Sequence, residues 1–107
     1  MSSTKVVNLR REPYDVYIGR ASGPRGVFGN RFEIGKDGDR EEVIRLFRID
    51  FLQRLQFEPG FLDKVVSLEG KRLGCFCKPL PCHGDVYVEF LEHLRKGAPH
   101  TKPPENG

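Results

Sequence analysis

The residue types best suited to chemistry lie in one short segment, Leu73 to Asp85. It reads Leu-Gly-Cys-Phe-Cys-Lys-Pro-Leu-Pro-Cys-His-Gly-Asp and holds all three cysteines of the chain. Thiolates and imidazole are soft donors that suit zinc or an iron–sulfur cluster. We therefore predict a functional centre in this segment.

A metal site here would use Cys75, Cys77, Cys82 and His83, with zinc as the expected ion. In an extended strand the side chains of Cys75 and Cys77 lie about 7 Å apart, whereas two sulfurs on one zinc lie roughly 4 Å apart. The strand must therefore bend between them. Cys82 and His83 are neighbours, and on a helix their side chains would diverge by about 100°. Three protein ligands with an outside ligand or water therefore strain the chain less than four.

Two other interpretations stay open. Amide groups at a helix N-terminus and a nearby imidazolium lower the pKa of a thiol, which would make Cys82 a nucleophile. The catalytic residues would then be Cys82, His83 and Asp85, with Asp85 orienting His83 or capping the helix. Alternatively the cysteines simply pack in the core, since free cysteine is among the most buried residue types. Whether the protein is an enzyme is left open by the sequence.

The elements around this segment alternate in type. Short β-branched runs predict strands at 5–9, 14–18 and 71–76. Asp39 and Glu42 form a capping box at the start of a long helix, and Pro59 is suited to open a second, shorter one. Apolar residues at helical spacing from Val86 to Leu94 predict the last helix. The order β-β-loop-α-α-β-α predicts an α/β fold, a small, partly parallel sheet flanked by helices.

Bulk composition limits the class of protein. A chain of 107 residues fits one domain, which we place at residues 1–97, with a disordered tail at 98–107 that is rich in proline. The sequence has no apolar run long enough to span a bilayer and no secretory signal, so we expect a cytoplasmic protein without a membrane partner. The net charge of +3 is lower than is usual for a protein dedicated to binding duplex DNA.

A glycine-rich loop from Gly19 to Gly38 carries several basic residues. Glycines let backbone amides approach a phosphate, and the charges of Arg20, Arg25, Arg31 and Lys36 could neutralise it. The fingerprints of a P-loop and of a dinucleotide-binding loop are both absent. A short strand at 31–34 is also compatible with the sequence.

The chain resembles an uncharacterised family of small bacterial and phage domains, domain of unknown function 4326. The resemblance runs from about Val6 to Leu91 and rests on the cysteine segment and on the motifs at 6–11, 15–20 and 29–32. It implies one composite site that joins the N-terminal strands to the cysteine segment. The residues that it adds to the cysteine segment are Asn8, Arg10, Tyr17, Gly19, Arg20, Gly29 and Asn30.

The expected function is binding of a nucleotide or a similar phosphorylated, base-containing small molecule. Arg10, Arg20 and the Gly29–Asn30 turn would hold the anionic part, and Tyr17 would stack on the base. One alternative is a zinc-stabilised, non-catalytic adaptor that binds nucleic acid or protein. Another is a phage-type protein that sequesters a host molecule. The sequence does not indicate the oligomeric state.

Overall fold

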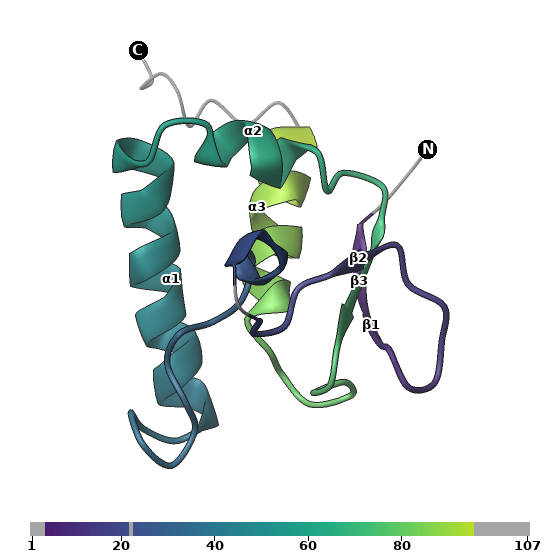
Figure 1. Ribbon diagram of the computed structural model, residues 1–107, viewed down its shortest axis with the longest axis vertical. Coiled ribbons are helices and arrows are strands. Elements are labelled where there is room, and N and C mark those ends of the chain that lie inside the picture. The colour runs from purple at the N-terminus through teal and green to yellow at the C-terminus, as the bar shows by residue number, and fades with distance from the viewer. Residues whose placement is uncertain (1–3, 22, 96–107) are drawn as a thin grey trace.

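The computed structural model describes residues 4–21 and 23–95. Within these ranges the chain forms β1 (Lys5–Asn8), β2 (Val16–Tyr17), a short 3-10 helix (Gly23–Gly26), α1 (Arg40–Phe57), α2 (Phe61–Val66), β3 (Arg72–Cys75) and α3 (Gly84–Arg95). In Figure 1 the helices lie to one side of the sheet, with α3 between the sheet and α1. The α/β class and the predicted order of elements are confirmed.

The sheet is parallel throughout, in the order β1-β3-β2. The last strand of the chain therefore lies between the first two. Val7 of β1 and Tyr17 of β2 both pair with Gly74 of β3. Because all three strands run the same way, their carboxyl ends meet at one edge, which is where ligands collect in sheets of this kind.

Helix α1 begins as the sequence predicts, but its capping box is only half formed. The Asp39 side chain accepts a hydrogen bond from the backbone N–H of Glu42. The Glu42 carboxylate does not return this contact and pairs with Arg45, three residues on, at Nε–Oε1 3.0 Å. Helix α2 begins after Gly60, which has a left-handed backbone conformation (φ 82°), and not at Pro59.

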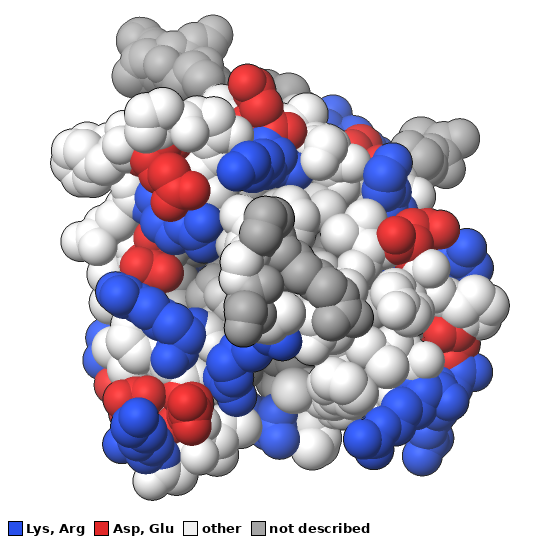
Figure 2. All heavy atoms as spheres, in the orientation of Figure 1, with Lys and Arg blue, Asp and Glu red and all other residues white. Residues whose placement is uncertain are grey.

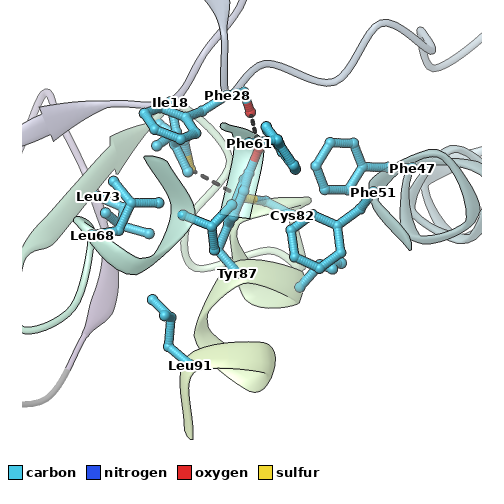
Figure 3. Packing of buried hydrophobic residues seen from close by; sticks show 13 residues of the cluster. Ile18, Phe28, Phe47, Phe51, Phe61, Leu68, Leu73, Cys82, Tyr87 and Leu91 are labelled. Carbon is cyan, nitrogen blue, oxygen red and sulfur yellow. Dashed lines mark hydrogen bonds between the residues drawn. The ribbon is translucent and has the colours of Figure 1, made fainter. Parts of the chain in front are cut away.

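A cluster of aromatic rings fills the space between the sheet and α1. Tyr87 of α3 lies at its centre, fully buried, with ring centroids 5.6 Å from Phe47 and 5.3 Å from Phe51 of α1 (Figure 3). Its hydroxyl donates to the carbonyl of Phe28 at 2.9 Å, a bond drawn as a dashed line in Figure 3. This bond holds the loop after β2 against the helices, and burial raises the pKa of Tyr87 well above its ordinary value.

The short strand expected at 31–34 is not formed, and only an isolated bridge joins Ile34 to Gly38. The predicted tail at 98–107 lies outside the described residues. None of the helices in the described ranges is long and apolar enough to cross a membrane.

The first of our predictions concerns the ion pair that joins β2 to β3. The Asp15 carboxylate accepts hydrogen bonds from the guanidinium and the backbone N–H of Arg72, which lower the pKa of Asp15 from 3.8 to about 2. A lowered pKa adds stability that is present above pH 3.8 and is lost as the pH falls through about 2. As the pH falls from 3.8 to about 2, the unfolding free energy of Asp15→Asn should therefore decrease less steeply than that of the wild type. Urea titrations at a series of pH values would measure both. In Arg72→Gln, the NMR titration of Asp15 should return toward the ordinary value, and an unchanged midpoint would contradict this account.

Candidate ligand and metal site

The three thiols gather at the carboxyl end of β3. The strand ends at Cys75 and the chain bends at Phe76, so the bend that a shared metal requires is present. Cys82 enters from the residues just before α3. The three Sγ atoms all lie within 4.8 Å of one another, and those of Cys75 and Cys82 are 3.2 Å apart. This group could hold a metal ion.

Cys82 lies two residues before the start of α3 and contacts its first turn. Its Sγ accepts a hydrogen bond from the backbone N–H of Gly84 at 3.2 Å, and its own N–H donates to Oδ2 of Asp85 at 3.1 Å. This reciprocal pair has the pattern of a capping box, with cysteine in the place of serine. Asp85 also forms an ion pair with Lys78, Nζ–Oδ1 2.9 Å. The positive end of the α3 dipole therefore faces the Cys82 sulfur.

The thiols of Cys75 and Cys82 titrate as a pair. A hydrogen bond from the Cys82 thiol, together with the backbone N–H groups of Cys77 and Lys78, lowers the pKa of Cys75 to about 6 despite its burial. The same hydrogen bond and burial raise the pKa of Cys82. The first thiolate of the pair is therefore expected on Cys75.

His83 does not belong to the thiol group. Its Nε2 lies 2.7 Å from the carbonyl oxygen of Ile18, which can only accept, so this nitrogen carries a proton. Its ring packs edge-on against Phe47 at a centroid distance of 5.1 Å. Burial lowers the pKa of His83, against the opposing effect of nearby carbonyls, and favours the neutral ring. The predicted fourth zinc ligand thus holds the end of β2 and is not placed with the sulfurs.

A cavity of about 480 Å³ opens beside the sulfurs. Its walls come from the end of β2, the following loop, the first turns of α1 and the cysteine segment. Four of the residues predicted to bind the ligand line this cavity: Tyr17, Gly19, Arg20 and Asn30. The four predicted metal ligands, the three cysteines and His83, line it as well. The structure therefore brings parts of the motifs at 15–20 and 29–32 and the cysteine segment to one cavity.

Tyr17, Gly19 and Arg20 form one side of the cavity. The Tyr17 hydroxyl donates to the carbonyl of Arg20 at 2.9 Å, and the ring folds over Gly19. A Cβ atom at Gly19 would lie 2.4 Å from that hydroxyl oxygen, so a side chain there would displace the ring. The Arg20 guanidinium donates to the carbonyl of Asn30 at 2.9 Å and is 3.3 Å from that of Phe32. Arg20 thus fixes the loop that forms the opposite rim.

The Gly29–Asn30 turn has a structural role in this geometry. The Asn30 side chain donates to the carbonyl of Val43 at 3.1 Å and accepts from the N–H of Phe32 at 2.9 Å. A Cβ at Gly29 would lie 2.8 Å from the carbonyl oxygen of Gly19, so only glycine fits this approach of two backbones. Gly29 lines a second hollow of about 450 Å³, behind Arg20, and not the cavity beside the sulfurs.

Asn8 and Arg10 are not among the residues that line the cavity. The Asn8 side chain donates to the carbonyl of Lys78 at 2.8 Å and accepts from the N–H of Arg10 at 2.9 Å. The Arg10 guanidinium lies 5.0 Å from the centroid of the Phe76 ring, a cation–π distance. Both residues therefore hold the cysteine segment in place.

The sequence interpretation missed several lining residues. Arg40, in the first turn of α1, donates to the carbonyl of Pro81 at 3.0 Å and so joins α1 to the cysteine segment. Phe76 and Ile34 line the cavity and are each 51 % exposed. Phe76 lies within the cysteine motif and could have been included on that ground. For Arg40 and Ile34 the sequence carries no such signal.

Comparison with known proteins agrees with the sequence resemblance. A family model described as Domain of unknown function (DUF4326) matches residues 2–93. An uncharacterized 12.4 kDa protein from the nrdA-td intergenic region of Enterobacteria phage T4 is 40% identical over 93 residues, which cover 86% of this chain and 81% of that protein. No solved structure is significantly similar.

The accessibility of the thiols gives a second prediction. Cys75 and Cys82 are each 2 % exposed, whereas Cys77 is only partly buried. In protein treated with a chelator, iodoacetamide should therefore alkylate Cys77 first, and the other two only after unfolding. Peptide mass spectrometry against time would show the order. Modification of Cys82 before Cys77 would restore Cys82 as the accessible nucleophile.

Proposed function

This chain belongs to the family described as Domain of unknown function (DUF4326), and we propose that it binds a nucleotide or similar phosphorylated, base-containing molecule in the cavity beside its thiols. The observation that carries the proposal is the composition of that cavity. It joins an arginine and an aromatic ring from the β2 end, Arg20 and Tyr17, to the sulfurs at the end of β3. Its volume of about 480 Å³ falls in the usual range for small-molecule sites.

The two ends of the cavity differ in character. Arg20 is exposed, and Arg40 lies in the first turn of α1, so positive charge is available where a phosphate would enter. Phe76 presents an exposed aromatic surface on which a base could stack. The sulfurs of Cys75 and Cys82 are almost fully buried. A ligand would therefore place its phosphate at the arginines and its base toward the sulfurs.

We further propose that the thiol group binds zinc. Two sulfurs on one zinc lie roughly 4 Å apart, so Cys75 and Cys82 would separate by about 0.8 Å from their present 3.2 Å. Backbone N–H groups already hydrogen-bond to these two sulfurs, as is common around metal-bound thiolates.

The adaptor with a structural zinc is the second candidate, because two of the three sulfurs are nearly inaccessible. A cavity ligand and a nucleic acid would differ in their dependence on salt, which is steep for contacts to a phosphate backbone. On the face shown in Figure 2, basic side chains are interspersed with acidic ones, apart from one basic cluster at the lower right. A continuous basic band that would follow a backbone is not seen there. This distribution favours the small ligand.

The zinc content of the purified protein tests the proposed metal site. Untagged protein should contain about one zinc per chain by elemental analysis. Cys75→Ser and Cys82→Ser should each lose most of it, since a tetrahedral site seldom survives with two sulfurs. His83→Asn is the matched control and should keep its zinc, because His83 is not in the group of ligand atoms that lie within 4.8 Å of one another. Loss of zinc in His83→Asn, or metal-free wild-type protein, would contradict this site.

Nucleotide binding by the Arg20→Gln variant tests the proposed ligand. Adding a panel of nucleoside monophosphates should shift NMR resonances of the cavity residues in the wild type. Arg20→Gln should weaken this binding by about 1.5–3 kcal/mol, the usual value of a charged hydrogen bond, or roughly ten- to hundred-fold in Kd. Arg45→Gln is the control, since Arg45 is exposed on α1 and pairs with Glu42.

Circular dichroism of Arg20→Gln would show whether the loop that Arg20 holds is still folded. Equal losses in Arg20→Gln and Arg45→Gln would indicate a diffuse charge effect and not a pocket. No shift with any member of the panel would exclude nucleotides as the ligand.

A further inference from the structure

The thiol group supplies three donors to a metal that prefers four. Tetrahedral zinc sites that serve only structure are closed by four protein ligands, whereas sites that act on a ligand keep one position open. Among the residues that the structure describes, the ligand group within 4.8 Å consists of Cys75, Cys77 and Cys82 alone. The identity of the fourth ligand therefore decides what the site can do.

The neighbouring protein donors are engaged elsewhere. Nε2 of His83 is bound to the Ile18 carbonyl at 2.7 Å. The Asp85 carboxylate is held by Lys78 at 2.9 Å and by the backbone N–H of Cys82 at 3.1 Å. Moving Asp85 to the metal would break contacts that fix the start of α3, and His83, with either ring nitrogen, is not in the group whose ligand atoms lie within 4.8 Å of one another.

The direction of the open position follows from the cavity. All three cysteines line it. On the protein side, the backbone N–H of Gly84 donates to the Cys82 sulfur at 3.2 Å. A metal seated on the sulfurs is thus enclosed by backbone on one side and faces the cavity on the other.

The charge of such a site allows an anionic fourth ligand. Three thiolates on a divalent ion leave one net negative charge, which would discourage another anion. The N–H hydrogen bonds to two sulfurs, the α3 dipole and the Lys78 ammonium all oppose that charge. They make the ion a better acceptor of a further donor atom.

We propose that the three-thiolate metal keeps its fourth position open to the cavity, where water or one donor atom of the ligand binds directly. This inference rests on the zinc site proposed above and extends it to the substrate class. Since the arginines lie toward the rim and the sulfurs of Cys75 and Cys82 are almost fully buried, the donor atom comes from the base end of a nucleotide-like molecule, and the phosphate stays at the rim.

Cobalt-substituted full-length protein tests the open position without any nucleotide. Co²⁺ reports its coordination through its visible d–d bands and its sulfur-to-metal charge-transfer band. Azide, a small monodentate anion, should displace the d–d bands in a saturable way while the charge-transfer band persists. Glu33 carries the carboxylate that lines the cavity. The same azide response in His83→Asn and in Glu33→Gln would show that neither side chain is the fourth ligand.

A pair of variants on one helix tests whether access is through the cavity. Ile44→Phe fills the cavity from α1 and should abolish or strongly reduce the azide response. Ile49→Phe, which adds the same ring at a 45 % exposed position of α1, should respond like the wild type. Equal responses in the two variants would overturn the cavity-facing position.

The outcomes separate the two proposals. Cobalt that binds one per chain with four-coordinate bands that azide does not change would overturn the open position and leave the metal site standing. A ratio of one ion to two chains would show that a second copy of the chain supplies the remaining ligands, and this result would also overturn the open position. Failure to bind cobalt or zinc at all would overturn both the metal site and this inference, whereas nucleotide binding is measured separately by NMR.

Discussion

The close approach of the first turn of α3 to the sheet is the constraint on which the site depends. A Cβ atom at Gly84 would lie 2.6 Å from Cδ1 of Ile18 and 2.8 Å from Cγ2 of Val6, so glycine allows the helix to start directly against the strands. From this approach follow the 3.2 Å contact of the Cys82 and Cys75 sulfurs and the bond of His83 to the Ile18 carbonyl. The three side chains that make these contacts all line the cavity.

That approach also creates an electrostatic problem. The hydrogen bond from the Cys82 thiol lowers the pKa of Cys75 to about 6, whereas the same bond, burial and repulsion from Cys75 raise the pKa of Cys82, so the two thiols do not both ionise readily. The helix terminus, the backbone N–H groups and Lys78 stabilise a single negative charge well. A divalent cation would allow the second and third thiols to ionise. The surroundings of the sulfurs are therefore better suited to a metal than to an apolar core.

The sequence predicted the elements and the position of the cysteine cluster at a strand end because both depend on local patterns. Periodicity marked the helices, and the rule that ligands collect at the carboxyl ends of parallel strands located the cysteine segment. The roles of Asn8 and His83 were not predictable in this way. Asn8 binds the carbonyl of Lys78, seventy residues along the chain, and His83 binds that of Ile18, sixty-five residues away. Every residue has a backbone carbonyl, so the sequence does not show which one a side chain will bind. A residue that binds a ligand and one that only holds the backbone therefore cannot be told apart from the sequence.

The strand order explains why these clamps recur. With β3 between β1 and β2, the cysteine segment leaves the sheet at its centre and needs support from both edges. On the β1 side, Asn8 and Arg10 hold it through Lys78 and Phe76. On the β2 side, His83 holds it through the Ile18 carbonyl, and beyond that bond the loop after Tyr17 and the first turns of α1 enclose the cavity. Of the residues that the family resemblance joins into one pattern, Asn8 and Arg10 on the β1 edge therefore position the cysteine segment, and Tyr17, Gly19 and Arg20 on the β2 edge line the cavity.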